Sequence, residues 1–278
     1  MLNFVCGERC FRLESPDGEK TICTGVEELC SSQEEADTKI ILHCMHIASH
    51  SPDETSIVIR SPDTDVFILL LHFSQHLNQK ILFDTGSGNK RRLINVKKVV
   101  ENVGDKLSHA LPALHSFSGC DTTSAFVRKG KIVALRTLRR NEEYLDVFLS
   151  LGKTLELTES VLTKLEEFVC KLYGKSNMKD INSLRYSKFL ERFRAKPGML
   201  LSTYNGIYMS LLPPCRDCLK MHIKRVNYQA LIKADQAVHD VPSPSGHGWQ
   251  IENDKLELKW TDNELMLQEL VDVLVDAE

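Results

Sequence analysis

The stretch TSIVIRSPDTDVFILLL, residues 55–71, joins two patterns at an acidic turn. Residues 55–60 are a short β-branched run, which is typical of a buried strand. Pro62 ends this run, and Asp63 stands before the apolar residues 66–71, where its side chain can cap a helix. The stretch therefore predicts a strand, a turn that carries Asp63 and Asp65, and a helix in direct succession.

The segment before this stretch predicts a hairpin and another helix. Pro16, Asp17 and Gly18 are a strong turn signal, so residues 1–30 are expected to form a β-rich lead-in with a hairpin. Ser31 and Ser32 precede Glu34 and Glu35 with the spacing of a capping box. The helix that follows is expected to run to about residue 49, before the Ser-Pro-Asp sequence at 51–53.

The segment after it continues the alternation. Residues 80–84 predict the next strand, residues 93–94 can pair back after the polar turn 86–92, and residues 96–110 predict a helix that ends at Pro112. Beyond Asp121 the pattern becomes mostly helical. Helices are predicted over residues 131–139, 142–150, 159–173, 184–193, 218–232 and 264–275.

This order of elements predicts an α/β fold with a mainly parallel sheet and flanking helices, followed by a mostly helical C-terminal region. Four regions are expected. They are a β-rich lead-in at 1–30, an acidic-site core at 31–140, a helical region at 141–240, and a linker with an acidic tail at 241–278.

Composition narrows the classes of protein. The chain has 278 residues, a net charge of -3 and 42% hydrophobic residues, which is enough for one large core or two smaller ones. No stretch approaches the roughly 20 apolar residues of a membrane span, and the first residues do not have the pattern of a signal peptide. The 9 cysteines are scattered, which favours reduced thiols in an intracellular protein of the nucleus or cytoplasm. Cys215 and Cys218 form a C-x-x-C pair near His222, but no fourth zinc ligand is evident, so a structural role is favoured.

Three acidic clusters carry the functional signal: residues 34–37, 61–65 and 118–121. Each alone is most often a set of helix caps or turn residues, but their joint occurrence at strand and helix ends favours a shared site. Several carboxylates in one place suit a hard cation, and a metal pair of this kind suits phosphodiester hydrolysis. The expected ligands of Mg²⁺ or Mn²⁺ are Glu35, Asp37, Asp63, Asp65 and Asp121, and the four aspartates are the expected catalytic residues.

A basic segment follows the last cluster. It contains no acid, whereas the tail from residue 252 onward is acidic. Basic side chains on one helix face can neutralise phosphates and bind DNA or RNA without sequence preference, although such a face can also be merely solvated. The predicted nucleic-acid-binding residues are Arg128, Lys129, Lys131, Arg136, Arg139 and Arg140.

These motifs resemble a known family. Glu-Ala-Asp at 35–37, Asp-x-Asp at 63–65 and Gly-Cys-Asp at 119–121, followed by a Gly-Lys turn at 130–131, are similar to the flap endonuclease (XPG-type) and PIN-domain nucleases. The amino-acid sequences around these motifs also resemble those of animal proteins of mobile-element type with a PIN-like domain. The likeness covers about residues 30–140. It implies a PIN-like fold, the metal ligands named above, and a helix–turn–helix near residue 130 that grips a nucleic-acid backbone.

Two departures from the family pattern keep alternatives open. The family has an earlier strand that ends in a metal-binding Asp, whereas residues 1–30 offer only Asp17, so the PIN-like fold is expected to be N-terminally incomplete. The turn at 127–131 has one glycine where the nucleases favour Gly-x-Gly. The sequence therefore predicts a nuclease-like protein or, alternatively, an inactive PIN-like module that binds nucleic acid or protein. A phosphatase of the haloacid dehalogenase type is disfavoured, because Phe67 stands where that motif has Thr or Val.

Overall fold

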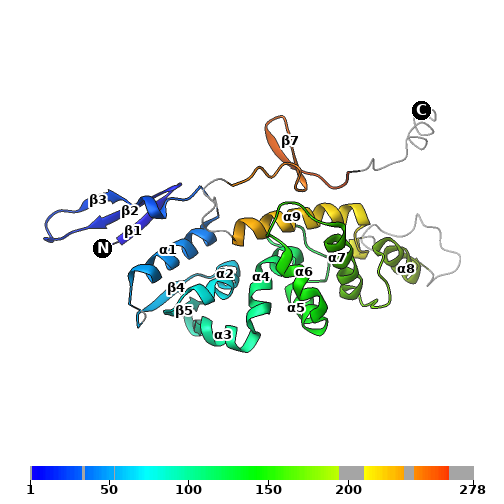
Figure 1. The fold of residues 1–278 in the computed structure, drawn as a ribbon, viewed down its shortest axis with the longest axis horizontal. Coiled ribbons are helices and arrows are strands. Elements are labelled where there is room, and N and C mark those ends of the chain that lie inside the picture. The colour runs from blue at the N-terminus through cyan, green and yellow to red at the C-terminus, as the bar shows by residue number, and fades with distance from the viewer. Residues whose placement is uncertain (1, 33–34, 53, 194–209, 235–240, 263–278) are drawn as a thin grey trace. The chain divides into compact units, whose positions relative to one another are not determined.

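The computed structural model describes residues 2–32, 35–52, 54–193, 210–234 and 241–262 (Figure 1). The chain divides into two compact units. The first contains Met1–Pro112 and Ile232–Ser243, and the second contains Ala113–Leu231 and Pro244–Glu278. Two helices, α4 (Asp105–Ser118) and α9 (Arg216–Ala234), have residues in both units.

The first unit begins with an antiparallel sheet, as the turn signal predicts. Its strands are β1 (Leu2–Cys6), β2 (Arg9–Glu14) and β3 (Ile22–Gly25), in the order β1-β2-β3. Between β2 and β3, Asp17 accepts hydrogen bonds from the backbone N–H groups of Glu19 and Lys20. A short 3-10 helix, η1 (Glu27–Leu29), leads from this sheet toward α1 (Ala36–His50). The N-cap of α1 is Glu35, so the predicted capping by Ser31 and Ser32 is wrong.

The second sheet of this unit is mixed. β4 (Ser56–Arg60) pairs parallel with β5 (Lys80–Thr85), and β5 pairs antiparallel with β6 (Arg92–Asn95). The α/β class is confirmed, but a mainly parallel sheet is not shown. The physical reason is the short turn between β5 and β6, because only antiparallel strands can be joined by so few residues.

Helices cover one face of this sheet. α1, α2 (Thr64–Phe73) and α3 (Val96–Val103) supply a core with Ile41, Val66, Leu70 and Val96, each 0% exposed. Ile57 and Ile59 of β4 point into this core, whereas Val58 between them is 56% exposed and Leu93 of β6 is 59% exposed. The described part of the chain thus leaves Val58 and Leu93, on the other face of the sheet, exposed.

The helix predicted over residues 96–110 is two helices. α3 ends at Gly104, whose φ of 90° is costly for other residues, and α4 begins directly after it. Pro112 does not end the helix as predicted, since α4 continues through it to Ser118.

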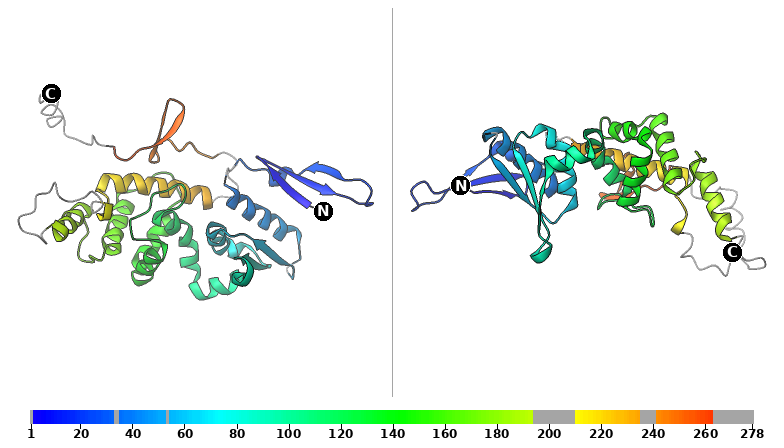
Figure 2. Two further views of the ribbon diagram at one scale, coloured as in Figure 1. Left: turned by 180° about the vertical axis from the view of Figure 1, so that it is seen from behind. Right: turned by 90° about the horizontal axis from the view of Figure 1, so that it is seen from below.

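The second unit is built mainly from helices, drawn green to yellow in Figure 2. Its core includes Phe117, Phe148 and Phe168, whose rings meet edge to face. Its helices are α4, α5 (Lys131–Arg140), α6 (Leu145–Ser150), α7 (Glu159–Leu172), α8 (Ile181–Phe193) and α9, with η4 (Glu142–Tyr144) before α6. The predicted helices therefore match, apart from their ends.

An antiparallel hairpin, β7 (Trp249–Glu252) and β8 (Lys255–Leu258), belongs to the same unit and was not predicted. It packs on α9, where buried Arg225 donates hydrogen bonds to the carbonyls of Gly248 and Lys259, each at 2.9 Å. The predicted tail helix over 264–275 lies outside the described residues. No helix among those described is both long enough and apolar enough to cross a membrane.

Candidate metal centre

Two helix starts place the first acidic residues. Asp37 lies in the first turn of α1, and Asp63 is the N-cap of α2, as its sequence predicts. The Asp63 carboxylate accepts a hydrogen bond from the N–H of Asp65 at 2.9 Å, while its own N–H donates to Ser61 Oγ at 3.0 Å. The turn that follows the end of β4 therefore fixes both aspartates beside one another.

The structure brings three of the predicted ligands together. Asp37, Asp63 and Asp65 each offer a carboxylate oxygen, and these oxygens lie within 4.8 Å of one another. Octahedral Mg²⁺ with bonds of about 2.1 Å needs oxygens about 3 Å apart for neighbouring positions and about 4.2 Å apart for opposite positions. The 4.8 Å limit is slightly wider than the 4.2 Å between opposite ligands, so a small closing movement of the side chains would let one cation bridge them. Carboxylates are the donors that Mg²⁺ and Mn²⁺ prefer.

The electrostatics of the cluster show crowded negative charge. Burial first, and then the carboxylates of Asp63 and Asp65, raise the pKa of Asp37 to about 6. A bound cation would reverse this effect, because it favours the ionised form. The charges of these three residues therefore fit a divalent ion, although exposed acidic groups are also common without one.

A buried lysine also lies at the cluster. Lys233 Nζ is 3.1 Å from Asp65 and 3.7 Å from Glu35, and its side chain is 4% exposed. Glu35 Oε2 is itself buried and has no hydrogen-bond partner among the described residues. Glu35 therefore lies near the cluster, as predicted, but with an ammonium group as its nearest cation.

The lysine was missed by sequence reasoning, because Lys233 follows Asp65 by 168 residues. The one local signal is a single cation between apolar residues and alanine, in Leu231-Ile232-Lys233-Ala234. That pattern is compatible with many helix ends, so it does not identify a partner.

Asp121 belongs to the second unit and is exposed. Its turn is built by local contacts: Thr123 Oγ1 donates to the Ser116 carbonyl at 2.6 Å. Gly119 has a φ of 109°, and a Cβ atom there would lie 2.6 Å from Ala125 Cβ. The glycine thus allows a close approach to Ala125. The role of Asp121 as a further ligand stays a prediction.

The predicted basic residues also lie in the second unit. Arg136, Arg139 and Arg140 are exposed on α5, opposite the buried Ala134 and Leu138. Arg139 and Arg140 occupy the last turn of α5, where positive charge also stabilises the helix.

The other three basic residues differ in their surroundings. Lys129 lies over the ring of Tyr173 at 5.1 Å, and Lys131 Nζ is 2.9 Å from His115 Nε2. Arg128 has a positive φ of 59°. Arg136, Arg139 and Arg140 are therefore the clearest phosphate-binding candidates, and this assignment stays a prediction.

His222 does not serve as a third zinc ligand beside Cys215 and Cys218. His222 Nε2 donates to the Phe117 carbonyl at 2.9 Å, and Nδ1 is 3.0 Å from Ser124 Oγ. Both ring nitrogens are used inside the second unit. All 9 cysteines are free.

Comparison of the chain with protein-family models, with curated proteins and with solved structures finds no match. The resemblance to XPG-type and PIN-domain nucleases therefore rests on the three sequence motifs. A proposal for the function must therefore be argued from the chemistry of the three carboxylates of Asp37, Asp63 and Asp65.

Proposed function

We propose that this protein is a metal-dependent, nuclease-like protein that binds nucleic acid and hydrolyses phosphodiester bonds with Mg²⁺ or Mn²⁺. The observation that carries the proposal is the convergence of Asp37, Asp63 and Asp65 within 4.8 Å at the end of β4. Ligands often gather outside the carboxyl ends of strands in α/β sheets, which is where this group lies.

Some residues of the site would bind the cation, and others orient these ligands. Asp37, Asp63 and Asp65 act as cation ligands. The backbone N–H of Asp65 donates to the Asp63 carboxylate and orients it, while the backbone N–H of Asp63 donates to Ser61 Oγ and fixes the turn. A bound divalent ion would lower the pKa of a water molecule and neutralise charge on the phosphate. Arg136, Arg139 and Arg140 are the proposed contacts to the nucleic-acid backbone.

A second candidate function is favoured by Lys233. Its ammonium group already neutralises part of the charge of Asp65 and Glu35. A PIN-like module that kept its fold but lost turnover could retain such an internal ion pair in place of a metal. The two candidates differ in whether the acidic group binds a divalent cation and whether cleavage follows.

The first experiment is calorimetric titration of the full chain with Mn²⁺, followed by cleavage of single-stranded and flap substrates in Mn²⁺. We expect Asp63→Ala to abolish cleavage and to weaken Mn²⁺ binding at least about tenfold, because it removes a ligand and the anchor of Asp65. Asp105→Asn is the matched control, since Asp105 is an exposed carboxylate in the first turn of α4.

The outcomes separate the candidates. Cleavage by Asp63→Ala at the rate of the unchanged chain would show that the activity comes from a contaminant. Mn²⁺ binding without cleavage would favour the inactive module. Absence of Mn²⁺ binding would refute the metal-dependent function.

A further inference from the structure

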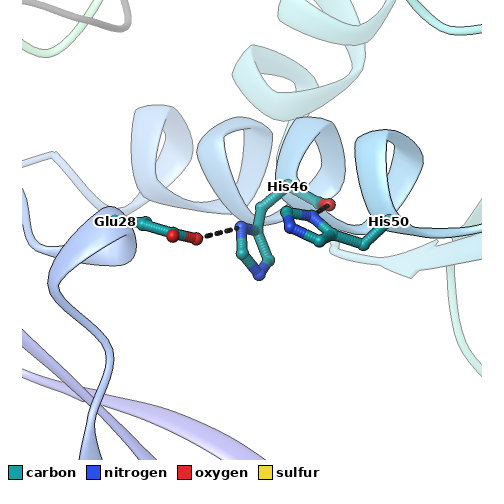
Figure 3. A group of neighbouring side chains, drawn as sticks. All are labelled: Glu28, His46 and His50. Carbon is teal, nitrogen blue, oxygen red and sulfur yellow. Dashed lines mark hydrogen bonds and ion pairs between the residues drawn. The ribbon is translucent and has the colours of Figure 1, made fainter.

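A second group of ligand atoms lies at the other end of α1. His46 and His50 are four residues apart and share a helix face, and Glu28 comes from η1. One ligand atom from each of these residues lies within 4.8 Å of the others (Figure 3). We propose that Glu28, His46 and His50 form a zinc site that joins η1 to α1.

The distance between the first two ligands fits this ion. Glu28 Oε2 lies 3.4 Å from His46 Nδ1. Tetrahedral Zn²⁺ with bonds of about 2.0 to 2.1 Å holds its ligand atoms about 3.4 Å apart. The two atoms are thus already spaced as neighbouring ligands of one ion.

The third ligand is oriented by its own helix. His50 Nδ1 lies 2.8 Å from the His46 carbonyl oxygen. A carbonyl only accepts hydrogen bonds, so Nδ1 carries the proton and Nε2 keeps its lone pair. Figure 3 shows this second ring nitrogen turned toward the His46 ring, with ring centroids 4.3 Å apart. A backbone carbonyl that holds the far ring nitrogen is the usual support for a metal-bound histidine.

The donor set selects the metal. Two imidazole nitrogens and one carboxylate oxygen suit Zn²⁺, whereas the all-carboxylate group of Asp37, Asp63 and Asp65 suits Mg²⁺ or Mn²⁺. Without a metal, the Glu28–His46 contact is a weak surface contact, because the Glu28 side chain is 69% exposed. That exposure also leaves a path for an ion and room for water as a fourth ligand.

The test is calorimetric titration of the untagged full chain with ZnCl₂, with Mg²⁺ added in excess to compete for the carboxylates of Asp37, Asp63 and Asp65. We expect one Zn²⁺ site and a rise in melting temperature of about 3 °C or more, since the ion binds only the folded arrangement. His50→Ala should weaken Zn²⁺ binding at least about tenfold and remove the rise in melting temperature. Because His50 is exposed, the metal-free melting temperature of this variant should stay unchanged.

Two controls exclude other zinc sites. His43→Ala changes another histidine of α1, whose Nε2 lies 3.9 Å from Cys10 Sγ, and Cys215→Ser with Cys218→Ser removes the C-x-x-C pair. Both control variants should bind Zn²⁺ as tightly as the unchanged chain. Full Zn²⁺ binding by His50→Ala, loss of binding in either control, or no binding by the unchanged chain would overturn the proposal. The result is independent of cleavage, so the proposal and the proposed function fail separately.

Discussion

At the scale of single residues, Lys233 decides how much negative charge the acidic group has for a cation. Its ammonium group lies 3.1 Å from Asp65 and 3.7 Å from Glu35. Two unit charges about 4 Å apart interact by about 4 kcal/mol at the effective dielectric constant near a protein surface. The lysine therefore stabilises the metal-free protein and competes electrostatically with a divalent ion.

This competition predicts opposite effects of one substitution. We expect Lys233→Met to bind Mg²⁺ about tenfold more tightly, because the repulsion between ammonium and cation is removed. In EDTA the same variant should lose about 3 kcal/mol of folding free energy, because the partly buried carboxylates of Asp65 and Glu35 lose the ammonium group that compensates their charge. Titration calorimetry and urea unfolding measure the two effects. Lys97→Met, an exposed lysine of α3, is the control, and weaker Mg²⁺ binding by Lys233→Met would contradict the prediction.

The sequence could predict some of these residues and not others. Asp63 and Asp65 are found from local order, because a strand, Pro62 and an apolar helix surround them. Asp37 is placed by the same logic at the start of α1. Lys233, and the approach of Glu28 to His46, depend on contacts between distant segments, which no local pattern specifies.

At the scale of elements, the mixed sheet has one covered face and one open face. Val58 and Leu93 lie on the open side and are 56% and 59% exposed. A sheet covered on both sides, as the expected parallel fold requires, would bury these side chains. Local sequence patterns predicted the three strands of this sheet. Which face of the sheet the helices cover depends instead on the path of the chain between the strands.

The open face predicts small effects of polar substitution. We expect Val58→Thr with Leu93→Thr to change the free energy of unfolding by less than about 1 kcal/mol, since neither side chain is buried and Thr suits strands. Urea unfolding measures this change. Ile57→Thr is the matched comparison and should cost more, because Ile57 is 7% exposed and lies in the core. A large loss in the double variant would show that this face is covered in solution.

The ends of elements were predicted less well for identifiable reasons. Gly104 stops α3 with a positive φ, whereas Pro112 is accommodated inside α4, so the glycine was the stronger signal. The β7–β8 hairpin turns at Asn253 and Asp254, which have φ values of 49° and 59°. Asn and Asp tolerate this conformation, so the Asn-Asp pair between two short β runs could have identified the hairpin.

At the scale of the whole molecule, each unit contains a histidine whose pKa is lowered by burial: His72 is partly buried and His222 is buried. Burial lowers the pKa of His72, in the first unit, to about 4, against the effect of its bond to the His109 carbonyl. Burial lowers the pKa of His222, in the second unit, to about 4, and Arg225 adds to this effect. The two units are therefore expected to share a sensitivity to acid.

The lowered pKa values determine whether the free energy of unfolding rises or falls with pH. Above the unfolded pKa of about 6.5 both states are neutral, so the contribution of each histidine to stability is complete. As pH falls toward 4, the unfolded chain takes up protons that the folded chain does not, so stability is lost. Each histidine should therefore lower the free energy of unfolding by about 2 kcal/mol at pH 5 relative to pH 7.5, because one pKa unit corresponds to about 1.4 kcal/mol.

Substitution by glutamine separates the two contributions, because it keeps a polar side chain but does not titrate. We expect His222→Gln to lose less stability than the unchanged chain between pH 7.5 and pH 5, by about 2 kcal/mol in urea unfolding. His72→Gln should behave in the same way, and the double variant should lose the least. If the units unfold in separate transitions, each single variant should alter the pH dependence of its own transition alone. An unchanged slope in both variants would show that neither imidazole is held neutral by the fold.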